Sequence, residues 1–274
     1  MTRVALVYDF DGTLARGNIQ EHSFIPETGM TAEQFWTRSN GAAREHDADQ
    51  ILTYMYEMMI QARAGGLKLT REYLHNHGRS VPFFDGVESW FGRVNKYALT
   101  LELELEHYVI SSGIREMILG CSIAREFRQV FASSFLYNEE GEAVWPALSI
   151  NYTTKTQYLF RINKGIENCW DNEAINRWVP PGNRRLPFEN MVFLGDGKTD
   201  IPSMKMVRHQ GGYAVAVFDP EKWDRLQNRI YGLIAEDRTN FVAPADYSEG
   251  SQLEVTVRGL LGRIAGREKV AREG

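Results

Sequence analysis

Val4-Ala-Leu-Val-Tyr8, followed by Asp9-Phe-Asp11-Gly-Thr13, is the stretch from which the architecture of this chain can be predicted. The first part is a short apolar run that ends at a turn signal, a pattern typical of a fully buried strand. Similar runs follow, with helical patterns between most of them, at residues 107–111, 130–136, 191–194 and 213–217. Buried strands alternating with helices predict an α/β fold, in which a mostly parallel, Rossmann-like sheet carries helices on both faces.

Two stretches depart from this alternation. Asn138-Glu-Glu-Gly141 is typical of a hairpin turn and predicts one antiparallel pair of strands. Leu and Glu alternate over residues 101–106, so this segment either begins the second strand or ends the helix before it.

Residues 18–84 contain no strand pattern and several helix starts. Thr31-Ala-Glu-Gln34 fits a capping box, Asp47 is expected to cap a long helix through Ala64, and Thr70 is expected to cap a third helix that stops near Gly78. We therefore predict a helical cap domain at 18–84, inserted into an α/β core made of 1–17 and 85–274.

The long helix of this insertion carries apolar side chains at helical spacing. The pattern favours core packing over a wall that faces a substrate, although we expect part of the helix around Met55–Met59 to border a pocket. The stripe consists of Tyr54, Met55, Met58, Met59 and Ala62.

The composition is typical of a soluble globular protein, since 43% of the 274 residues are apolar and 24% are charged. The net charge of −5 predicts no nucleic-acid or membrane-surface partner. No apolar run is long enough to span a membrane and residues 1–9 lack signal-peptide features, so we expect a cytoplasmic protein. The two cysteines, Cys121 and Cys169, are expected to be reduced and mostly buried.

Carboxylates follow two of the predicted strands. Asp9 and Asp11 come after the first strand, and Gly195-Asp196-Gly-x-x-Asp200 comes after the 191–194 strand, although Asp200 could simply cap the next helix. Ligands of open α/β sheets bind at this edge. At an effective dielectric of about 20, two carboxylates about 4 Å apart repel by roughly 4 kcal/mol. A hard divalent cation removes that repulsion, and Mg²⁺ with retained waters suits phosphate substrates.

A lysine and a serine are further candidates. Lys155 is expected in the first turn of a helix capped by Thr154-Lys-Thr-Gln157, where the helix dipole disfavours a cation. A residue that breaks a local rule in this way is a stronger functional candidate than Lys164, at the favourable end of the same helix. Ser111, at the end of the second predicted strand, is a weaker candidate, because by itself such a serine is usually an ordinary turn residue.

In their order along the chain, these residues resemble the four motifs of the haloacid dehalogenase-like (HAD) phosphohydrolases. The helical insertion falls where the phosphoserine phosphatase-like branch of that superfamily carries its cap. The four segments are Asp9-x-Asp11-Gly-Thr13, Ser111, Lys155 and Gly195-Asp196-Gly-x-x-Asp200.

The resemblance implies a two-step phosphoryl transfer. Asp9 would attack phosphorus and form an aspartyl-phosphate, while Asp11 would act first as acid and then as base. Ser111 and Lys155 would hold the phosphoryl oxygens.

The resemblance also implies a metal site and contacts to the substrate. Mg²⁺ would be bound by Asp9, the backbone carbonyl of Asp11 and Asp196, with support from Asp200. Thr13 would assist Asp11 or the phosphoryl group. The remaining substrate- or phosphate-binding candidates are Ser112, Gly113 and Asn18.

Two departures bear on the substrate. Asn18 stands where phosphoserine-specific members carry a Glu, and Ser112-Gly113 stands where they carry two glycines. The implied activity is therefore Mg²⁺-dependent hydrolysis of a small phosphorylated metabolite whose cap-facing group is neutral or anionic.

Other functions remain open from the sequence. A phosphotransferase or phosphomutase would use the same core and pass the phosphoryl group to an alcohol. From a different class, a non-catalytic phosphoacceptor of the receiver type also uses an acidic cluster, a hydroxyl and a lysine, but without a cap; a binding protein without catalysis is the last alternative. Free phosphate release separates the hydrolase from the phosphotransferase or phosphomutase.

Two basic pairs are expected to have no role in the site. His75-x-His77 is interpreted as two exposed histidines at a helix end, and Arg184-Arg185 as a solvated pair in a loop rich in Pro and Gly.

Overall fold

The structure of the protein is a computed structural model that describes residues 1–197 and 199–273. In these residues, seven strands form one sheet in the order β4-β3-β2-β1-β5-β6-β7. Neighbouring strands are parallel, except that β3 and β4 form the antiparallel hairpin predicted at Asn138–Gly141. The strands are β1 (Thr2–Tyr8), β2 (Leu103–Ile114), β3 (Gln129–Tyr137), β4 (Ala143–Leu148), β5 (Met191–Gly195), β6 (Tyr213–Phe218) and β7 (Phe241–Pro244).

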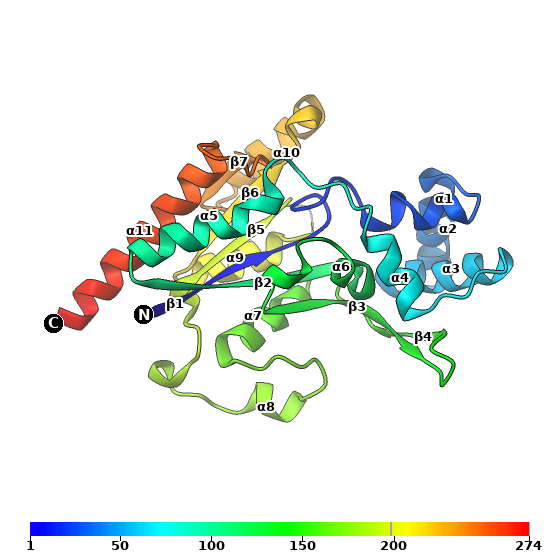
Figure 1. Cartoon of the computed structure of the whole chain (residues 1–274), viewed down its shortest axis with the longest axis horizontal. Helices are drawn as coiled ribbons and strands as arrows, with labels where there is room; N and C mark the ends of the chain where they lie inside the picture. The colour runs from blue at the N-terminus through cyan, green and yellow to red at the C-terminus, as the bar shows by residue number, and fades with distance from the viewer. Residues whose placement is uncertain (198, 274) are drawn as a thin grey trace.

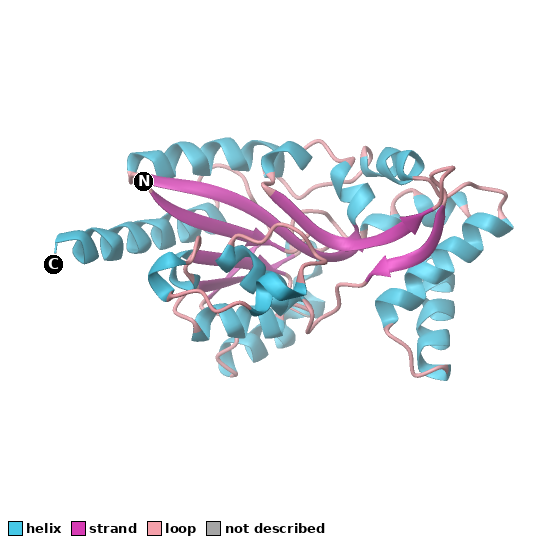
Figure 2. Ribbon diagram, turned by 90° about the horizontal axis from the view of Figure 1, so that it is seen from below, coloured by secondary structure: helices cyan, strands magenta, loops and turns pink. Residues whose placement is uncertain are grey.

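Helices cover both faces of the sheet, as predicted (Figures 1 and 2). Because successive strand residues point to opposite faces, Leu6 packs in the same core cluster as α5 and α11, while Ala5 and Val7 pack with α7 and α9. The α-helices that follow residue 84 are α5 (Val87–Thr100), α6 (Arg115–Leu119), α7 (Lys155–Lys164), α8 (Asn172–Asn176), α9 (Ile201–His209), α10 (Trp223–Ala235) and α11 (Gln252–Glu273). Short 3-10 helices are η1 (Ile19–Glu21), η2 (Ala124–Glu126), η3 (Pro181–Asn183), η4 (Phe188–Asn190) and η5 (Pro220–Lys222).

Four helices occupy the segment predicted to be a cap, and they lie at the end of the molecule away from both termini (Figure 1). They are α1 (Phe24–Glu27), α2 (Ala32–Glu45), α3 (Gln50–Ala64) and α4 (Arg71–Gly78). The capping box of Thr31 and Gln34 is present at α2, and the Thr70 hydroxyl caps α4. The division into a core and a cap domain stays a prediction.

The expected cap of α3 was wrong by two residues. Asp49 caps this helix by accepting from the amides of Ile51 and Leu52, while Asp47 lies in a left-handed turn with φ of 48°. The apolar stripe of α3 is buried, so core packing is confirmed for Met55, Met58, Met59 and Ala62.

Helix α4 of this segment packs directly against α6 of the sheet region. A Cβ on Gly78 would lie 1.9 Å from the Met117 carbonyl oxygen, and one on Gly120 would lie 1.9 Å from the His75 carbonyl oxygen. The two backbones can approach this closely only because both positions are glycine. The tight packing of α4 on α6 therefore anchors α4 near the carboxyl ends of β2 and β3.

Several details could not be read from local patterns. The ambiguous Leu–Glu alternation divides, with α5 ending at Thr100 and β2 beginning at Leu103. Strand β7 was not predicted, because it is four residues long, lies at the sheet edge and ends in Pro244.

Both cysteines are free thiols, as expected. Within residues 1–197 and 199–273, no helix combines the length and hydropathy that a membrane crossing requires.

Candidate active site

The loops that follow β1 and β5 meet at the carboxyl edge of the sheet. The Asp9 amide donates to the Leu194 carbonyl at 2.9 Å, which joins the two strand ends. Gly12 has φ of 73°, and a Cβ there would lie 3.3 Å from Oδ2 of Asp196. A glycine at this turn therefore lets the first acidic loop curl against the second.

Lys155 connects the two acidic loops. Its Nζ lies 2.9 Å from Oδ2 of Asp9 and 2.7 Å from Oδ1 of Asp200, and all three side chains are buried. Burial alone would lower the pKa of Lys155, but the Asp200 and Asp9 carboxylates outweigh it and raise that pKa. The lysine is therefore a fixed cation beside Asp9. Asp200 uses its carboxylate for this ion pair and makes no cap bond to α9.

The helix that carries Lys155 begins differently from expectation. The Thr154 hydroxyl makes no cap bond to α7; it accepts from the Asn151 amide at 2.8 Å instead. The Asn151 side chain in turn accepts from the amides of Thr153 and Thr154. The capping box predicted at Thr154–Gln157 was therefore wrong, although Lys155 does occupy the first turn.

Three carboxylates are close enough together to hold a metal ion. Asp9, Asp196 and Asp200 each offer an oxygen within 4.8 Å of the others. Oδ2 of Asp200 is buried and has no hydrogen-bond partner among the described residues. Burial and the neighbouring Asp200 raise the pKa of Asp9 well above its usual range. An all-oxygen, anionic donor set fits a hard divalent cation, which would relieve this repulsion.

Gly195 is required for that arrangement. A Cβ at this position would lie 2.4 Å from Oδ2 of Asp200 and 2.6 Å from its Cγ. Any larger residue would push the Asp200 carboxylate away from Lys155.

Asp11 makes no ion pair with Lys155 within 4.0 Å in the described residues, and it borders the cavity described below. Its Oδ1 accepts from the Ile19 amide at 3.0 Å, and a Cβ on Gly113 would lie 3.0 Å from its Oδ2. Burial raises the pKa of Asp11 to about 7 despite that amide. A carboxyl group with this pKa can both donate and accept a proton near neutral pH.

Ser111 is placed by an irregularity in β2. The pairing of β2 with β3 shifts register between Ser111 and Ile114, and such bulges re-aim side chains near sites. Oγ of Ser111 accepts from the Gly113 amide at 3.0 Å. Ser111 and Ser112 thereby line the same cavity as Asp9 and Asp11.

These side chains form the floor of a cavity of about 600 Å³. Its floor comes from the carboxyl ends of β1, β2 and β5, and most of its wall comes from η1, α2 and α3. The residues that line it are Asp9, Asp11, Asn18, Gln20, Trp36, Asn40, Arg44, Gln50, Ile51, Tyr54, Ser111, Ser112, Tyr152, Asp196 and Thr199.

Some of the predicted site residues line the cavity and others do not. Asp9, Asp11, Ser111, Ser112, Asp196 and Asn18 line the cavity, while Lys155, Asp200 and Gly113 lie behind that lining in contact with it. Thr13 does not line the cavity; its hydroxyl is buried without a hydrogen-bond partner among the described residues.

Sequence reasoning missed most of the wall. The α3 helix contributes Gln50, Ile51 and Tyr54 from its first turns. No residue of the expected Met55–Met59 segment lines the cavity, and its three methionines pack in the core. Gln20, Trp36 and Arg44 belong to no motif. The packing of α2 over the strand ends brings Trp36 and Arg44 to the site, and η1 brings Gln20. The sole sequence signal was the place of Tyr54 in the stripe.

No protein-family model matches the sequence. Among curated proteins, an uncharacterized protein of Borreliella burgdorferi is 27% identical over 278 residues, which cover 91% of this chain and 93% of that protein. The likeness therefore extends over nearly the whole of both chains.

Solved structures share the fold at low sequence identity. A substrate-bound phosphoserine phosphatase superposes with a TM-score of 0.57 and 14% identity, covering 94% of this chain and 99% of that one. This chain has a HAD-type, phosphoserine phosphatase-like fold. A HAD family hydrolase of Salmonella enterica superposes with a TM-score of 0.52 and 17% identity over 81% of this chain, which spans 64% of that hydrolase's length.

Proposed function

We propose that this protein is a Mg²⁺-dependent phosphatase that hydrolyses a small phosphate monoester through an aspartyl-phosphate on Asp9. The observation that carries the proposal is the position of Asp9, which borders the cavity while Lys155 holds its carboxylate at 2.9 Å. Asp11 and Ser111 line the same cavity, and Asp196 and Asp200 complete the three-carboxylate cluster with Asp9. Phosphoryl transfer depends on such positioning and on charge placed around the phosphoryl group.

In the first half of the reaction, an Asp9 carboxylate oxygen attacks phosphorus and the bond to the ester oxygen breaks. Asp11 gives its proton to the departing oxygen, so that the alcohol leaves neutral. The Ser111 hydroxyl and the Lys155 ammonium hold the phosphoryl oxygens while negative charge develops on them.

In the second half, the aspartyl-phosphate is hydrolysed. Asp11, now a carboxylate, takes a proton from a water molecule that attacks phosphorus, which releases phosphate and restores both aspartates. Asp9 and Asp196 would hold Mg²⁺ with support from Asp200, and the bound ion would supply positive charge to the phosphoryl group.

The cavity wall favours a substrate without an ammonium group. Asn18 occupies the wall, and its amide donates to Oε1 of Glu21 at 2.6 Å. The Trp36 indole donates to the same oxygen at 2.6 Å, so Glu21 is engaged in holding the wall together. Among the lining residues from η1, α2 and α3, the charged side chain is Arg44, which suits a neutral or anionic group.

The proposal is tested by measuring free phosphate from a panel of sugar, polyol and nucleoside monophosphates and phosphoserine, with Mg²⁺ and with chelator. Phosphate release that requires the cation is expected, with phosphoserine not leading the panel. A lead of tenfold or more for phosphoserine would contradict the role assigned to Asn18 and make Glu21 the next residue to test. Transfer to an added alcohol without free phosphate would instead identify a phosphotransferase.

A further inference from the structure

Gln20 is a buried residue of the cavity wall that belongs to none of the motifs. It lies in η1, is 2% exposed and lines the cavity. The preceding residue, Ile19, donates its amide to Asp11 at 3.0 Å. Gln20 is therefore held beside the group that we propose protonates the departing oxygen.

The neighbours of Gln20 fix which end of its amide is engaged. The Tyr54 hydroxyl donates to the Ser112 carbonyl at 2.5 Å, so its oxygen can only accept a further bond. The Gln20 side chain interacts with this tyrosine, and its NH₂ group is the end that can donate to the hydroxyl oxygen. Oε1 of Gln20 is the other end, and it is buried without a partner in the part of the chain that the structure describes.

Ser112 also lines the cavity and carries a second buried polar atom. Its Oγ also has no hydrogen-bond partner within residues 1–197 and 199–273. Tyr54 connects the two residues, because it contacts the Gln20 side chain and the Ser112 backbone. Buried polar atoms are rarely left unpaired, so two of them at one cavity wall indicate a ligand group that pairs with both.

We infer that Gln20 and Ser112 read a hydroxyl group next to the ester carbon, so that the substrate is the monophosphate of a polyol or sugar. This inference rests on the proposed function and names its substrate class. A hydroxyl donates to Oε1 of Gln20 and accepts from the Ser112 hydroxyl, which satisfies both groups at once. An ammonium group only donates and would leave the Ser112 proton without an acceptor.

The test compares three substrates of nearly equal size that differ in one group: 2-hydroxyethyl phosphate, 2-aminoethyl phosphate and propyl phosphate. We expect kcat/KM for the hydroxyl compound to exceed that for propyl phosphate by about tenfold or more, because a site built to bond a hydroxyl rejects the analogue without it. Preference for 2-aminoethyl phosphate would overturn the choice of a hydroxyl.

Gln20→Leu and Ser112→Ala identify the residues responsible. Each is expected to bring the ratio of kcat/KM for hydroxyethyl over propyl phosphate at least about fivefold closer to one. The ratio is measured within one preparation, so it does not depend on the folded fraction. Gln227→Leu, on α10 and outside the cavity lining, should keep the wild-type ratio.

The outcomes distinguish failure of this inference from failure of the proposed phosphatase function. Equal kcat/KM for all three compounds in the wild type, or an unchanged ratio in both cavity variants, overturns the inference and leaves the phosphatase standing. Phosphate release from none of the three, and from none of the wider panel, overturns the proposed function and the inference with it.

Discussion

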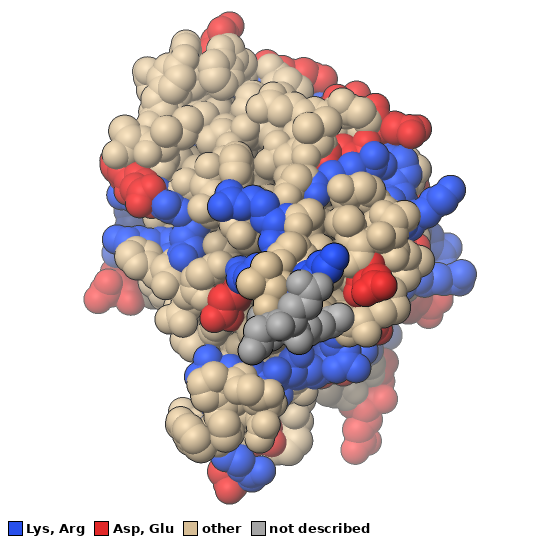
Figure 3. Space-filling model, turned by 90° about the vertical axis from the view of Figure 1, so that its left-hand side faces the viewer, with Lys and Arg blue, Asp and Glu red and all other residues tan. Residues whose placement is uncertain are grey.

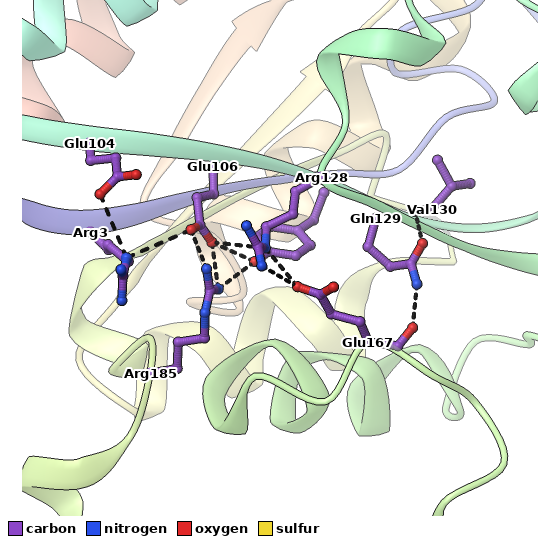
Figure 4. Close-up of polar contacts among 9 residues, drawn as sticks. Arg3, Glu104, Glu106, Arg128, Gln129, Val130, Glu167 and Arg185 are labelled. Atoms are coloured by element: carbon purple, nitrogen blue, oxygen red, sulfur yellow. Dashed lines mark hydrogen bonds and ion pairs between the residues drawn. The ribbon is translucent and has the colours of Figure 1, made fainter.

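The strand β2 joins two charged clusters of opposite character. At its carboxyl end, Ser111 lies in the cavity with the aspartates, and near its amino end Glu106 lies among arginines (Figure 4). The face of the molecule at the amino ends carries acidic and basic side chains interleaved (Figure 3). The contrast shows how the balance of charge in a cluster separates a structural role from a functional one.

The cluster at the amino end is neutralised by its own members. Glu106 is 7% exposed and contacts Arg3, Arg128 and Arg185. Burial alone would raise the pKa of Glu106, but Arg185, Tyr108 and Arg128 together outweigh it and lower that pKa. The prediction that Arg185 is solvated was therefore wrong. Its two terminal guanidinium nitrogens donate to the two carboxylate oxygens of the buried Glu106.

The cluster at the carboxyl end is not neutralised in the same way. Four aspartates share the region with Lys155 and Arg229, which lies 3.6 Å from Asp196. Burial is the largest cause of the raised pKa of both Asp9 and Asp11. Local negative charge and unpaired buried oxygens therefore destabilise this end, and a bound cation would relieve the repulsion.

The largest effect is expected from Asp9→Asn, which keeps the shape of the side chain and removes its nucleophilic charge. Loss of a nucleophile should lower kcat for phosphate release by about a thousandfold or more. Glu106→Gln removes a carboxylate from the opposite cluster and serves as the matched control, with kcat near that of the wild type. More than about a hundredth of wild-type activity in Asp9→Asn would contradict its role.

The same Glu106→Gln variant should show the second largest effect, on stability. Removing one partner of a buried ion pair costs about 3–5 kcal/mol, and partial exposure of the arginines places this case near about 3 kcal/mol. Chemical unfolding would measure it as a lower free energy of unfolding. An unchanged midpoint and slope would contradict the prediction, because they would show that the Glu106 ion pairs add nothing to the free energy of unfolding.

Mg²⁺ should produce the opposite change at the carboxyl end. At a hundredfold excess over Kd, binding adds about 2.7 kcal/mol, which raises Tm by several degrees. Asp196→Asn should remove most of this shift, whereas Glu106→Gln should keep it. A wild-type Tm that does not respond to Mg²⁺ would exclude the proposed metal site.

The smallest effect concerns His107, the neighbour of Glu106 on β2. Its Nδ1 accepts from the Tyr8 hydroxyl, which itself accepts from Trp90, and its Nε2 donates to Asn95. Burial lowers the pKa of His107 from 6.5 to about 3, so the folded protein keeps it neutral. Below pH 6.5 the unfolded chain binds the extra proton, so stability falls as the pH falls toward 3.

The measurement is the difference in unfolding free energy between wild type and His107→Gln. The wild-type advantage should narrow by about 1 kcal/mol for each pH unit below 6.5. A constant difference between pH 7.5 and 5 would mean that the folded protein also protonates this histidine. Glu106 stays ionised over this range, so its cluster does not obscure the result.

Sequence alone determined most strands of the sheet and the positions of the motif residues, although not the edge strand β7. A buried strand, a turn at glycine and a carboxylate after the turn are all set by neighbours in the chain, so Asp9, Asp11 and Asp196 could be placed at strand ends. The parallel arrangement then required those ends to share one edge of the sheet.

Tertiary structure alone decided what surrounds that edge. Gln20, Tyr54 and Ser112 meet because α3 packs over the carboxyl ends of the strands, and Arg185 meets Glu106 across 79 residues of chain. Periodicity and turn residues record only which face of an element is apolar. Which polar atoms remain unpaired after packing depends on contacts between distant segments, and those unpaired atoms are the basis of the substrate hydroxyl that we infer.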